Sequence, residues 1–344
     1  MKKLIKLISL ICIVALFAGC SLVSTTEEEA EVPKSETAVI INGVEYTAAR
    51  FNIYYYSAQD EILQTAGYVN ADDIPADFWE QKTDGKANLE RAKEIAIDNL
   101  VKDALAYQKA EKLGIELTAE EKSNLTNQMA YIKQDPKSYE QIGIMGTTED
   151  ELMKFWEEQT CVSHILPALI EKGELNVDEA AAEKQLKDEY VRVKHILTFT
   201  INPQTQEPLA EDQVKIAEER VQEILAKINA GEDFDKLAEQ YNQDGNVDYL
   251  FTKGEMVAEF ETVAFSLADN QVSGPVYSPY GIHIIKKIPM DMKGEQEELK
   301  LQAIKSQMVM PDYEKLLEDW VKNAKIEKKE DVLKKEGAKI VSKK

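Results

Sequence analysis

Side chains that could perform acid–base, nucleophilic or metal chemistry are few in this chain of 344 residues, which contains three histidines and three cysteines. Cys161 and His164 lie close together, but no second pair of ligands follows them, and a closed zinc site needs four ligands. We therefore interpret Cys161 as a small buried hydrophobe and His164 as a structural or incidental residue. His195 and His283 lie later in the chain, within two segments whose patterns are typical of strands.

The first twenty residues carry a different kind of chemistry. Two lysines precede an almost uninterrupted apolar run over residues 4–17, and small residues follow it, which is typical of an export signal. The apolar run is too short for a confident membrane span. The sequence LFAGC (16–20) resembles a bacterial lipobox, in which cleavage leaves the cysteine as an acylated N-terminus, although Phe17 stands where leucine is usual. A plain secretory peptide with an incidental Cys20 is the alternative.

Composition limits the possible functions. The chain has 41 Lys and Arg against 63 Asp and Glu, a net charge of -22, which would repel a phosphate backbone and argues against nucleic acid as a partner. Since Cys12 would leave with the signal and Cys20 would be acylated, no internal disulfide can form. The folded parts must therefore be held by apolar cores, and the length predicts two folded units.

The flanking parts of the chain are predicted to be helical. Residues 20–36, rich in Ser, Thr and Glu, are interpreted as a flexible tether that follows the signal of residues 1–19. Residues 37–188 begin with a hairpin at an Asn-Gly turn and continue as amphipathic helices, two of them opened by capping boxes at Thr118 and Thr148. Residues 291–344 are again helical, and we expect them to pack on the N-terminal part because both apolar faces need a partner.

The intervening block, residues 189–290, has a different pattern. Its order of predicted elements is strand, helix, helix, strand, helix, strand, strand. This order predicts an α+β domain with a four-stranded mixed sheet, inserted in the mostly helical, chaperone-like domain that the flanks form.

Five short segments of this block, in order, resemble the parvulin family of prolyl isomerases. They read VKHIL (193–197), GEDFDKLA (231–238), KGEMVAEFE (253–261), AFSL (264–267), and GPV before YGIHIIK (274–276 and 280–286). Each segment alone is weak, but five in the family's order are specific. The helical flanks, the lipobox and the tether are similar in layout to PrsA-type foldase lipoproteins, which implies a parvulin domain inside a helical chaperone-like domain.

The resemblance implies a site that needs no metal, cofactor or nucleophile. An X-Pro amide loses its resonance when it twists, so a catalyst need only bind the twisted amide better than the planar forms. The implied catalytic residues are His195, Asp244 and His283, and the implied substrate-binding residues are Met256, Phe260, Leu250, Ser278 and Tyr280. The histidines are expected to fix a hydrogen-bond network through complementary tautomers. The alternative is that they are ordinary satisfied core histidines, and that Ser278 and Tyr280 are simple strand-end residues.

The chain departs from the family between Tyr241 and Phe251, where parvulins usually have a longer, Gly-rich loop. Asp244 matches the family's acidic or thiol residue near the amide, but Asp-Gly is also a common turn pair, so both roles stay open. The family's leucine of the proline slot has no clean counterpart, and Leu250 or Val247 would have to replace it. Residues 198–212 contain no Lys or Arg, which argues against phosphopeptide specificity.

We expect an extracytoplasmic, lipid-anchored prolyl isomerase and foldase whose partners are unfolded exported proteins with X-Pro bonds. The alternative is a holdase whose parvulin domain is weak or inactive and serves as a platform for clients. The shortened loop favours the holdase, and the retained His195, His283, Met256 and Phe260 favour the enzyme. A solute-binding lipoprotein would need a two-lobed α/β pattern that the sequence does not show.

Overall fold

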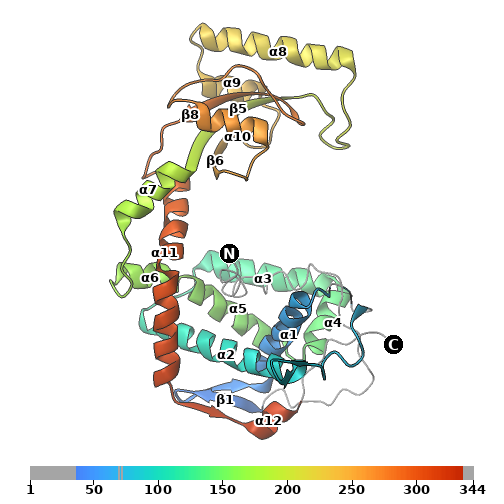
Figure 1. Ribbon diagram of the computed structural model, residues 1–344, viewed down its shortest axis with the longest axis vertical. Helices are drawn as coiled ribbons and strands as arrows, with labels where there is room; N and C mark the ends of the chain where they lie inside the picture. Colours follow the sequence, from blue (N-terminus) through green and yellow to red (C-terminus); the bar gives the residue numbers. More distant parts are fainter. Residues whose placement is uncertain (1–35, 69, 71–72, 336–344) are drawn as a thin grey trace. The chain divides into compact units, whose positions relative to one another are not determined.

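The computed structural model describes residues 36–335 except 69, 71 and 72, and these residues form two compact units. One unit comprises the described residues up to Leu175 together with those from Pro311 onward, and the other comprises Asn176–Met310 (Figure 1). The predicted signal, the predicted lipidation at Cys20 and residues 21–35 of the predicted tether lie outside the described residues.

The first unit is mostly helical, as its periodicity predicts. Its helices are α1 (Ala48–Thr65), α2 (Asn88–Lys112), α3 (Ala119–Gln134), α4 (Pro136–Ile144), α5 (Glu149–Ser163), α6 (Ile165–Glu171), α12 (Glu330–Lys334) and the later residues of α11 (Glu295–Asn323). Its strands are β1 (Thr37–Ile41), β2 (Val44–Thr47), β3 (Lys82–Thr83), β4 (Lys86–Ala87) and β9 (Ile326–Lys328). Apolar faces of α1, α2 and α5 meet in one core that contains Phe51, Leu100 and Phe155.

A three-stranded sheet joins the two ends of the first unit. β1 and β2 form the predicted hairpin, and the turn residues Asn42 and Gly43 both have positive φ angles, 53° and 87°, as a tight two-residue turn requires. On its other edge β1 pairs antiparallel with β9. The side chains of Val332 and Leu333 join the same core as the N-terminal helices.

The two predicted capping boxes differ in the structure. At the start of α3 the Thr118 hydroxyl accepts from the Glu121 amide and the Glu121 carboxylate accepts from the Thr118 amide, so the predicted box is confirmed. At the start of α5 Thr148 caps the helix, but the Glu151 carboxylate accepts from the Thr47 hydroxyl and pairs with Arg50. The carboxylate thus joins two segments that are distant in sequence.

The second unit has the predicted order of elements. Its helices are α7 (Glu179–Glu189), α8 (Glu211–Asn229), α9 (Phe234–Tyr241), α10 (Ala258–Ser266) and the first residues of α11, and its strands are β5 (Tyr190–Phe199), β6 (Asp248–Thr252), β7 (Val276–Tyr277) and β8 (Gly281–Ile288). The α+β class is therefore confirmed. The unit is wider than residues 189–290 at both ends, because Ala182 and Leu186 of α7 pack against Leu301 and Ile304 of α11.

The sheet itself corrects one expectation. Its strand order is β6-β5-β8-β7, and all three pairings are antiparallel, so the predicted mixed sheet is wrong. The reason lies in the segment before β6. The side chain of Asn242 accepts from the Leu197 amide and the Gln243 amide donates to the Leu197 carbonyl, both at 2.9–3.0 Å, at the carboxyl end of β5. After this anchor near the end of β5 the chain reaches Lys194, opposite which β6 starts at Asp248, and β6 runs back along β5 to Tyr190.

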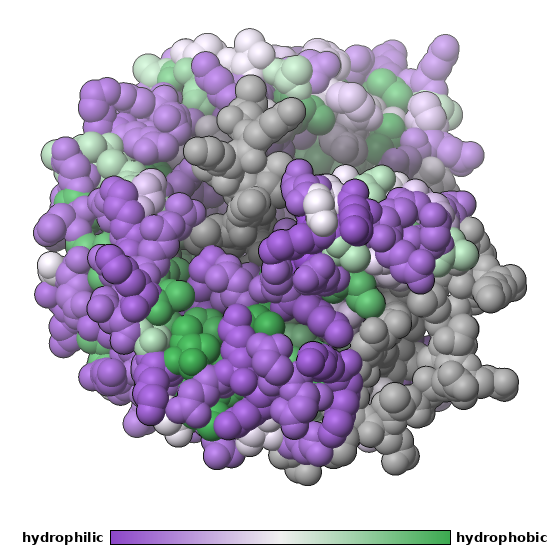
Figure 2. Space-filling model, turned by 60° about the horizontal axis from the view of Figure 1, so that its bottom comes forward, coloured by the Kyte–Doolittle hydropathy of each residue, from purple (hydrophilic) through white to green (hydrophobic). Residues whose placement is uncertain are grey.

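On the face shown in Figure 2, hydrophilic residues cover most of the surface and hydrophobic residues emerge in small groups. Of the helices that the described part of the chain forms, none combines the length and the apolar character that crossing a bilayer requires.

Candidate active site

The antiparallel sheet of the second unit separates two apolar clusters, because alternate residues of a strand point to opposite faces. Val193 of β5 packs on one face with residues of α10, and Ile196 packs on the other face with residues of α8 and α9. His195 lies two residues after Val193, and His283 lies two residues before Ile285, another member of the α10 cluster. The two predicted histidines therefore share the face that α10 covers.

The imidazole rings of His195 and His283 lie side by side in the floor of this face. Their Nδ1 atoms are 3.2 Å apart, and the rings are nearly parallel, with an interplanar angle of 20°. Both side chains are buried, with exposed fractions of 2% and 5%. The structure thus brings together the two histidines that were expected to share a hydrogen-bond network.

The partners of the two rings define their tautomers. Nε2 of His195 lies 3.0 Å from the Asn246 carbonyl oxygen, which can only accept, so His195 carries its proton on Nε2 and accepts at Nδ1. His283 must then donate from Nδ1, and its Nε2 accepts from the Ser278 hydroxyl at 2.8 Å. The Ser278 oxygen in turn accepts from the Tyr280 amide. These bonds run in one direction through two neutral rings, which is the complementary pattern that we predicted.

Burial favours this neutral state. Burial, and then the neighbouring His195, lowers the pKa of His283 to about 4. Burial also lowers the pKa of His195, against the opposing effects of the Asn246 carbonyl and the Asp244 carboxylate. At neutral pH the pair is therefore uncharged and fixed in orientation.

Asp244 lies at the edge of the same site. Its Oδ2 atom is 3.1 Å from Nε2 of His195 and accepts from the Tyr249 hydroxyl at 2.9 Å. Burial, and then this hydrogen bond, raises the pKa of Tyr249 to about 12, so the hydroxyl stays a donor. The side chain of Asp244 is about one-third exposed, which leaves the carboxylate accessible from solvent.

Two asparagines hold the shortened loop that carries Asp244. Asn242 accepts from the amides of Leu197 and Asp244 and donates to the carbonyls of Asp244 and Asn246. Asn246 accepts from the amides of Val247 and Asp248. Side-chain bonds to nearby backbone groups are typical of tight loops, and here they fix the loop at its reduced length.

An aromatic wall stands over the histidines. Phe260 is buried, and its ring centroid lies 5.4 Å from that of His195 and 5.1 Å from that of His283, with steep interplanar angles. Phe251 lies 5.9 Å from Phe260, and the half-buried Met256 packs against the same cluster. The predicted slot residues Phe260 and Met256 therefore belong to the same apolar assembly, on the face of the histidines.

The turn between β7 and β8 forms another border of the site. The Ser278 amide donates to the Gly281 carbonyl, and the Ser278 hydroxyl reaches His283 as described. The aromatic side chains of Tyr277 and Tyr280 are 57% and 46% exposed. Gly281 allows β8 to approach β5 closely, because a Cβ at this position would lie 2.3 Å from the Thr198 carbonyl oxygen.

Leu250 does not join this site. It pairs with Arg192 across β5 and β6, so its side chain points to the face opposite His195, and Val247 packs with the cluster on that far face as well. The expectation that Leu250 lines the slot is therefore wrong, because the strand places Tyr249 and Phe251 on the histidine face. Tyr249 lies 5.3 Å from the His195 ring.

Three residues of the site were not predicted from the sequence: Tyr249, Asn242 and Asn246. Tyr249 could have been found from alternation, since it lies two residues from Phe251, which is buried and faces the α10 cluster. The asparagines carry only a general turn signal, and their bonds to β5 and within the loop depend on tertiary contacts. Together the residues form an apolar wall over a neutral, rigid polar floor with one carboxylate at its edge, an arrangement that can hold a proline ring and orient an adjacent amide.

Several known proteins and one protein family are similar to this chain. The family described as rotamase, PPIC-type PPIase domain, matches residues 195–288. The chain is 28% identical to the Foldase protein PrsA of Caldanaerobacter subterraneus over 91% of this chain and 93% of that protein. It is 33% identical to the Foldase protein PrsA of Geobacillus sp. over 44% of this chain and 54% of that protein. Among solved structures, PrsA from Bacillus subtilis matches with 21% identity and a TM-score of 0.36, covering 77% of this chain and 98% of that one.

Proposed function

With a PPIC-type peptidyl-prolyl isomerase domain in residues 195–288 as the premise, we propose that this protein is a parvulin-type isomerase that acts as a foldase on exported proteins. The observation that carries the proposal is the contact of Phe260 with both rings of the buried His195–His283 pair. An apolar wall fixed to a neutral polar floor suits the binding of a prolyl residue, and the similarity to PrsA foldases extends over most of the chain.

The site would act by binding the twisted amide. A planar X-Pro amide isomerises slowly because its C–N bond has partial double-bond character, and this character is lost at the transition state. Met256 and Phe260 would hold the ring, while the charge on Asp244 would favour the electron distribution of the twisted amide. His195 and His283 would keep Asp244, Ser278 and the floor in place, without exchanging protons with the substrate.

The holdase remains the second candidate, and one observation favours it. The loop around Asp244 is short and held by Asn242 and Asn246, so the side of the slot near Asp244 has less chain around it than the longer family loop would provide. In this case the parvulin domain would bind clients weakly, and the helical unit would suppress their aggregation.

An isomerisation assay on the chain from residue 21 onward separates the two candidates, because this form contains every residue that the structure describes. Acceleration of cis–trans exchange in a prolyl tetrapeptide supports the isomerase. If the protein prevents aggregation of an unfolded client but leaves the exchange rate unchanged, the holdase is the function.

We also propose that the protein is anchored outside the cytoplasmic membrane through an acylated Cys20. The support is the sequence LFAGC (16–20) after an apolar signal, and two or more acyl chains anchor a protein stably. Cys20→Ser should release the protein from the membrane fraction or change its location. A Cys20→Ser protein that stays membrane-bound with its signal removed would show that the lipobox interpretation is wrong.

The proposed domain organisation keeps the boundaries predicted from the sequence, although residues 176–188 and 291–310 belong to the same compact unit as the four-stranded sheet. Residues 1–19 would be the signal, 20–36 the lipidated cysteine and tether, and 189–290 the isomerase domain. Residues 37–188 and 291–344 would form the helical chaperone-like domain. Support comes from the antiparallel pairing of β1 with β9, which links the N-terminal hairpin to the C-terminal segment. Val39→Pro introduces a proline into the central strand of this sheet and should therefore destabilise the helical unit.

A further inference from the structure

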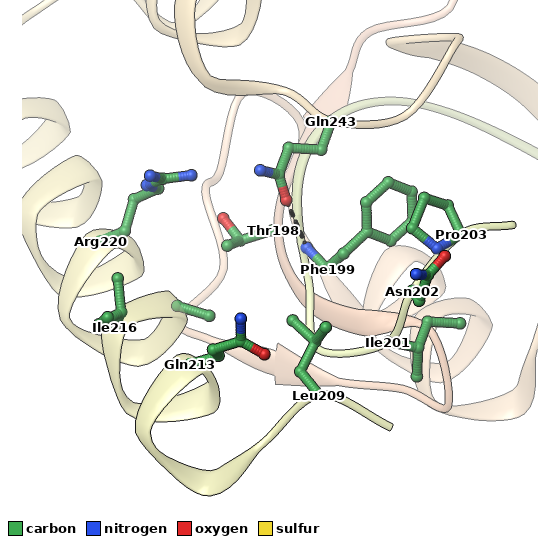
Figure 3. Close-up of a pocket in the computed structure, with 11 residues that line it drawn as sticks. Thr198, Phe199, Ile201, Asn202, Pro203, Leu209, Gln213, Ile216, Arg220 and Gln243 are labelled. Carbon is green, nitrogen blue, oxygen red and sulfur yellow. Dashed lines mark hydrogen bonds between the residues drawn. The ribbon is translucent and has the colours of Figure 1, made fainter. Parts of the chain in front are cut away.

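A pocket of about 540 Å³ opens on the second unit, and His195, His283 and Phe260 are not among the residues that line it. It lies between the end of β5, the loop that follows it, α8 and the loop before β6 (Figure 3). Its apolar lining consists of Phe199, Ile201, Pro203, Leu209, Ile216 and Ala217. Its volume falls in the range of small-ligand sites, about 300–1,000 Å³. Ile216 is 58% exposed, so the pocket offers apolar surface directly to solvent.

The sheet separates this pocket from the isomerase site. Thr198, at the floor of the pocket, lies two residues after Ile196, whose side chain packs on the α8 and α9 face. His195 lies on the other face. A ligand in the pocket therefore does not occupy the slot formed by Phe260 and Met256.

The polar groups of the pocket are mainly donors. The carbonyl oxygen of the Gln243 side chain accepts from the Phe199 amide at 2.7 Å, which leaves its NH₂ group for a ligand. The side-chain oxygen of Gln213 likewise accepts from the Ala210 amide, and its NH₂ group is left. In the part of the chain that the structure describes, the buried hydroxyl of Thr198 has no hydrogen-bond partner.

Arg220 adds a positive charge to these donors. Its guanidinium group points into the same space as the Gln243 amide and Thr198 (Figure 3). Within the described residues no carboxylate forms a salt bridge with Arg220; the nearby Glu223 interacts with it electrostatically but forms its salt bridge, at 2.8 Å, with Lys227. A guanidinium without a salt bridge is notable in a chain with a net charge of -22, in which carboxylates outnumber cations.

These groups define the chemistry of a ligand. Three sets of donors and one cation require an acceptor with negative charge, and a guanidinium binds a carboxylate through two parallel hydrogen bonds. The surrounding apolar side chains require an apolar group next to that carboxylate. An unpaired buried hydroxyl is unfavourable, so an acceptor that reaches Thr198 would add to the affinity.

We propose that this pocket is a second peptide-binding site, which takes an acidic side chain of an unfolded chain together with the apolar side chain next to it. That the ligand is a peptide rests on the proposed function, in which the protein handles unfolded chains. The pocket gives such a chain an attachment point on the isomerase domain that does not depend on proline. Segments with glutamate or aspartate beside leucine, isoleucine or valine are the expected ligands.

The test uses two octapeptides without proline, GSLLELSG and GSLLQLSG. Each peptide carries fluorescein at its N-terminus and an amide at its C-terminus. Their binding to the chain from residue 21 onward is measured by fluorescence anisotropy. We expect the glutamate peptide to bind about tenfold more tightly than its glutamine counterpart, because a charge-assisted hydrogen bond is stronger than a neutral one. An excess of unlabelled proline peptide should not displace it.

Variants of α8 assign the binding to the pocket. Arg220→Ala should weaken binding of the glutamate peptide about tenfold and leave binding of the glutamine peptide within twofold. Lys215→Ala is the matched control, because Lys215 is an exposed cation of the same helix that does not line the pocket. Ile216→Ser should weaken the binding of both peptides. Gln243 is left unchanged, because it holds the loop that carries Asp244.

The outcomes separate this proposal from the isomerase proposal. Equal binding of the two peptides, an equal effect of Lys215→Ala and Arg220→Ala, or displacement by the proline peptide would each overturn the second site. Loss of isomerase activity plays no part in that decision, since Arg220→Ala is expected to keep the exchange rate of a prolyl tetrapeptide. A protein without isomerase activity that still binds the glutamate peptide through Arg220 would refute the isomerase and retain the second site.

Discussion

The Nδ1 atoms of His195 and His283 lie 3.2 Å apart in a buried site, so a single proton serves both. A second proton would place two N–H groups against each other. Since the pKa of His283 is lowered from 6.5 to about 4, the unfolded chain binds more protons than the folded chain between these two values. The free energy of unfolding of this unit should therefore fall as the pH decreases from 6.5 to 4, by about 3 kcal/mol from this residue.

This pH dependence can be assigned to His283 by substitution. Urea unfolding of the intact chain and of His283→Gln should show a smaller pH slope in the variant between pH 4 and 6.5, because glutamine does not titrate. Titration of the His283 ring, followed by NMR, should occur near pH 4. A ring that titrates near pH 6.5 would contradict the neutral, shared-proton arrangement.

Asp244→Asn tests the charge at the edge of the site. The amide keeps the shape of the carboxylate and can still accept from the Tyr249 hydroxyl, but it has no charge near the substrate amide. If the charge favours the twisted state, kcat/KM for a prolyl peptide should fall about tenfold to a hundredfold while the melting temperature stays within about 2 °C. Tyr249→Phe is the control, since it removes the hydroxyl and keeps the charge. A lower melting temperature with unchanged kinetics would instead assign Asp244 to the turn.

Phe260 is expected to contribute to both catalysis and stability. Phe260→Ala removes a wall of the slot and should lower kcat/KM roughly tenfold to two-hundredfold. The same change leaves a cavity beside His195 and His283 and should cost about 3–5 kcal/mol of stability. Phe260→Leu retains most of the volume, so it separates the two effects. Binding of unfolded clients by the helical unit should persist in both variants, and its loss would show that the isomerase domain is the main client site.

The sequence predicted the elements of the second unit well, because period-two and helical patterns depend on neighbouring residues. The alternation at residues 191–197 agrees with β5, whose odd and even residues face different clusters. The direction of β6 could not be predicted in this way, since it depends on hydrogen bonds between Asn242 and the distant Leu197. The same limit explains Leu250, for which residue type was a poorer guide than the register that places Tyr249 beside His195.

The charged core of the first unit was also missed. Arg50 is buried and pairs with Glu151 and Glu158, and Asp103 accepts from the Tyr54 hydroxyl at 3.0 Å and from the Gln159 amide at 2.7 Å. In a helical sequence such charges resemble a solvated face. Their burial follows from the packing of α1, α2 and α5, which no single helix reveals.

Asp103 leads to a pH dependence of opposite sign in the first unit. Burial, opposed by hydrogen bonds from Gln159 and Tyr54, raises its pKa from 3.8 to about 7. Between these values the folded state binds more protons than the unfolded state, so the contribution of Asp103 to stability is complete below pH 3.8 and is lost as the pH rises to 7.

Asp103→Asn should therefore reduce the fall in unfolding free energy between pH 5 and 8, which is on the order of 2 kcal/mol in the unmodified protein. Tyr54→Phe removes one of the bonds that stabilise the carboxylate and should make the fall steeper. Urea unfolding at pH 5, 6, 7 and 8, followed by tryptophan fluorescence, measures these slopes, and equal slopes in the unmodified protein and Asp103→Asn would show that Asp103 is ionised throughout this range.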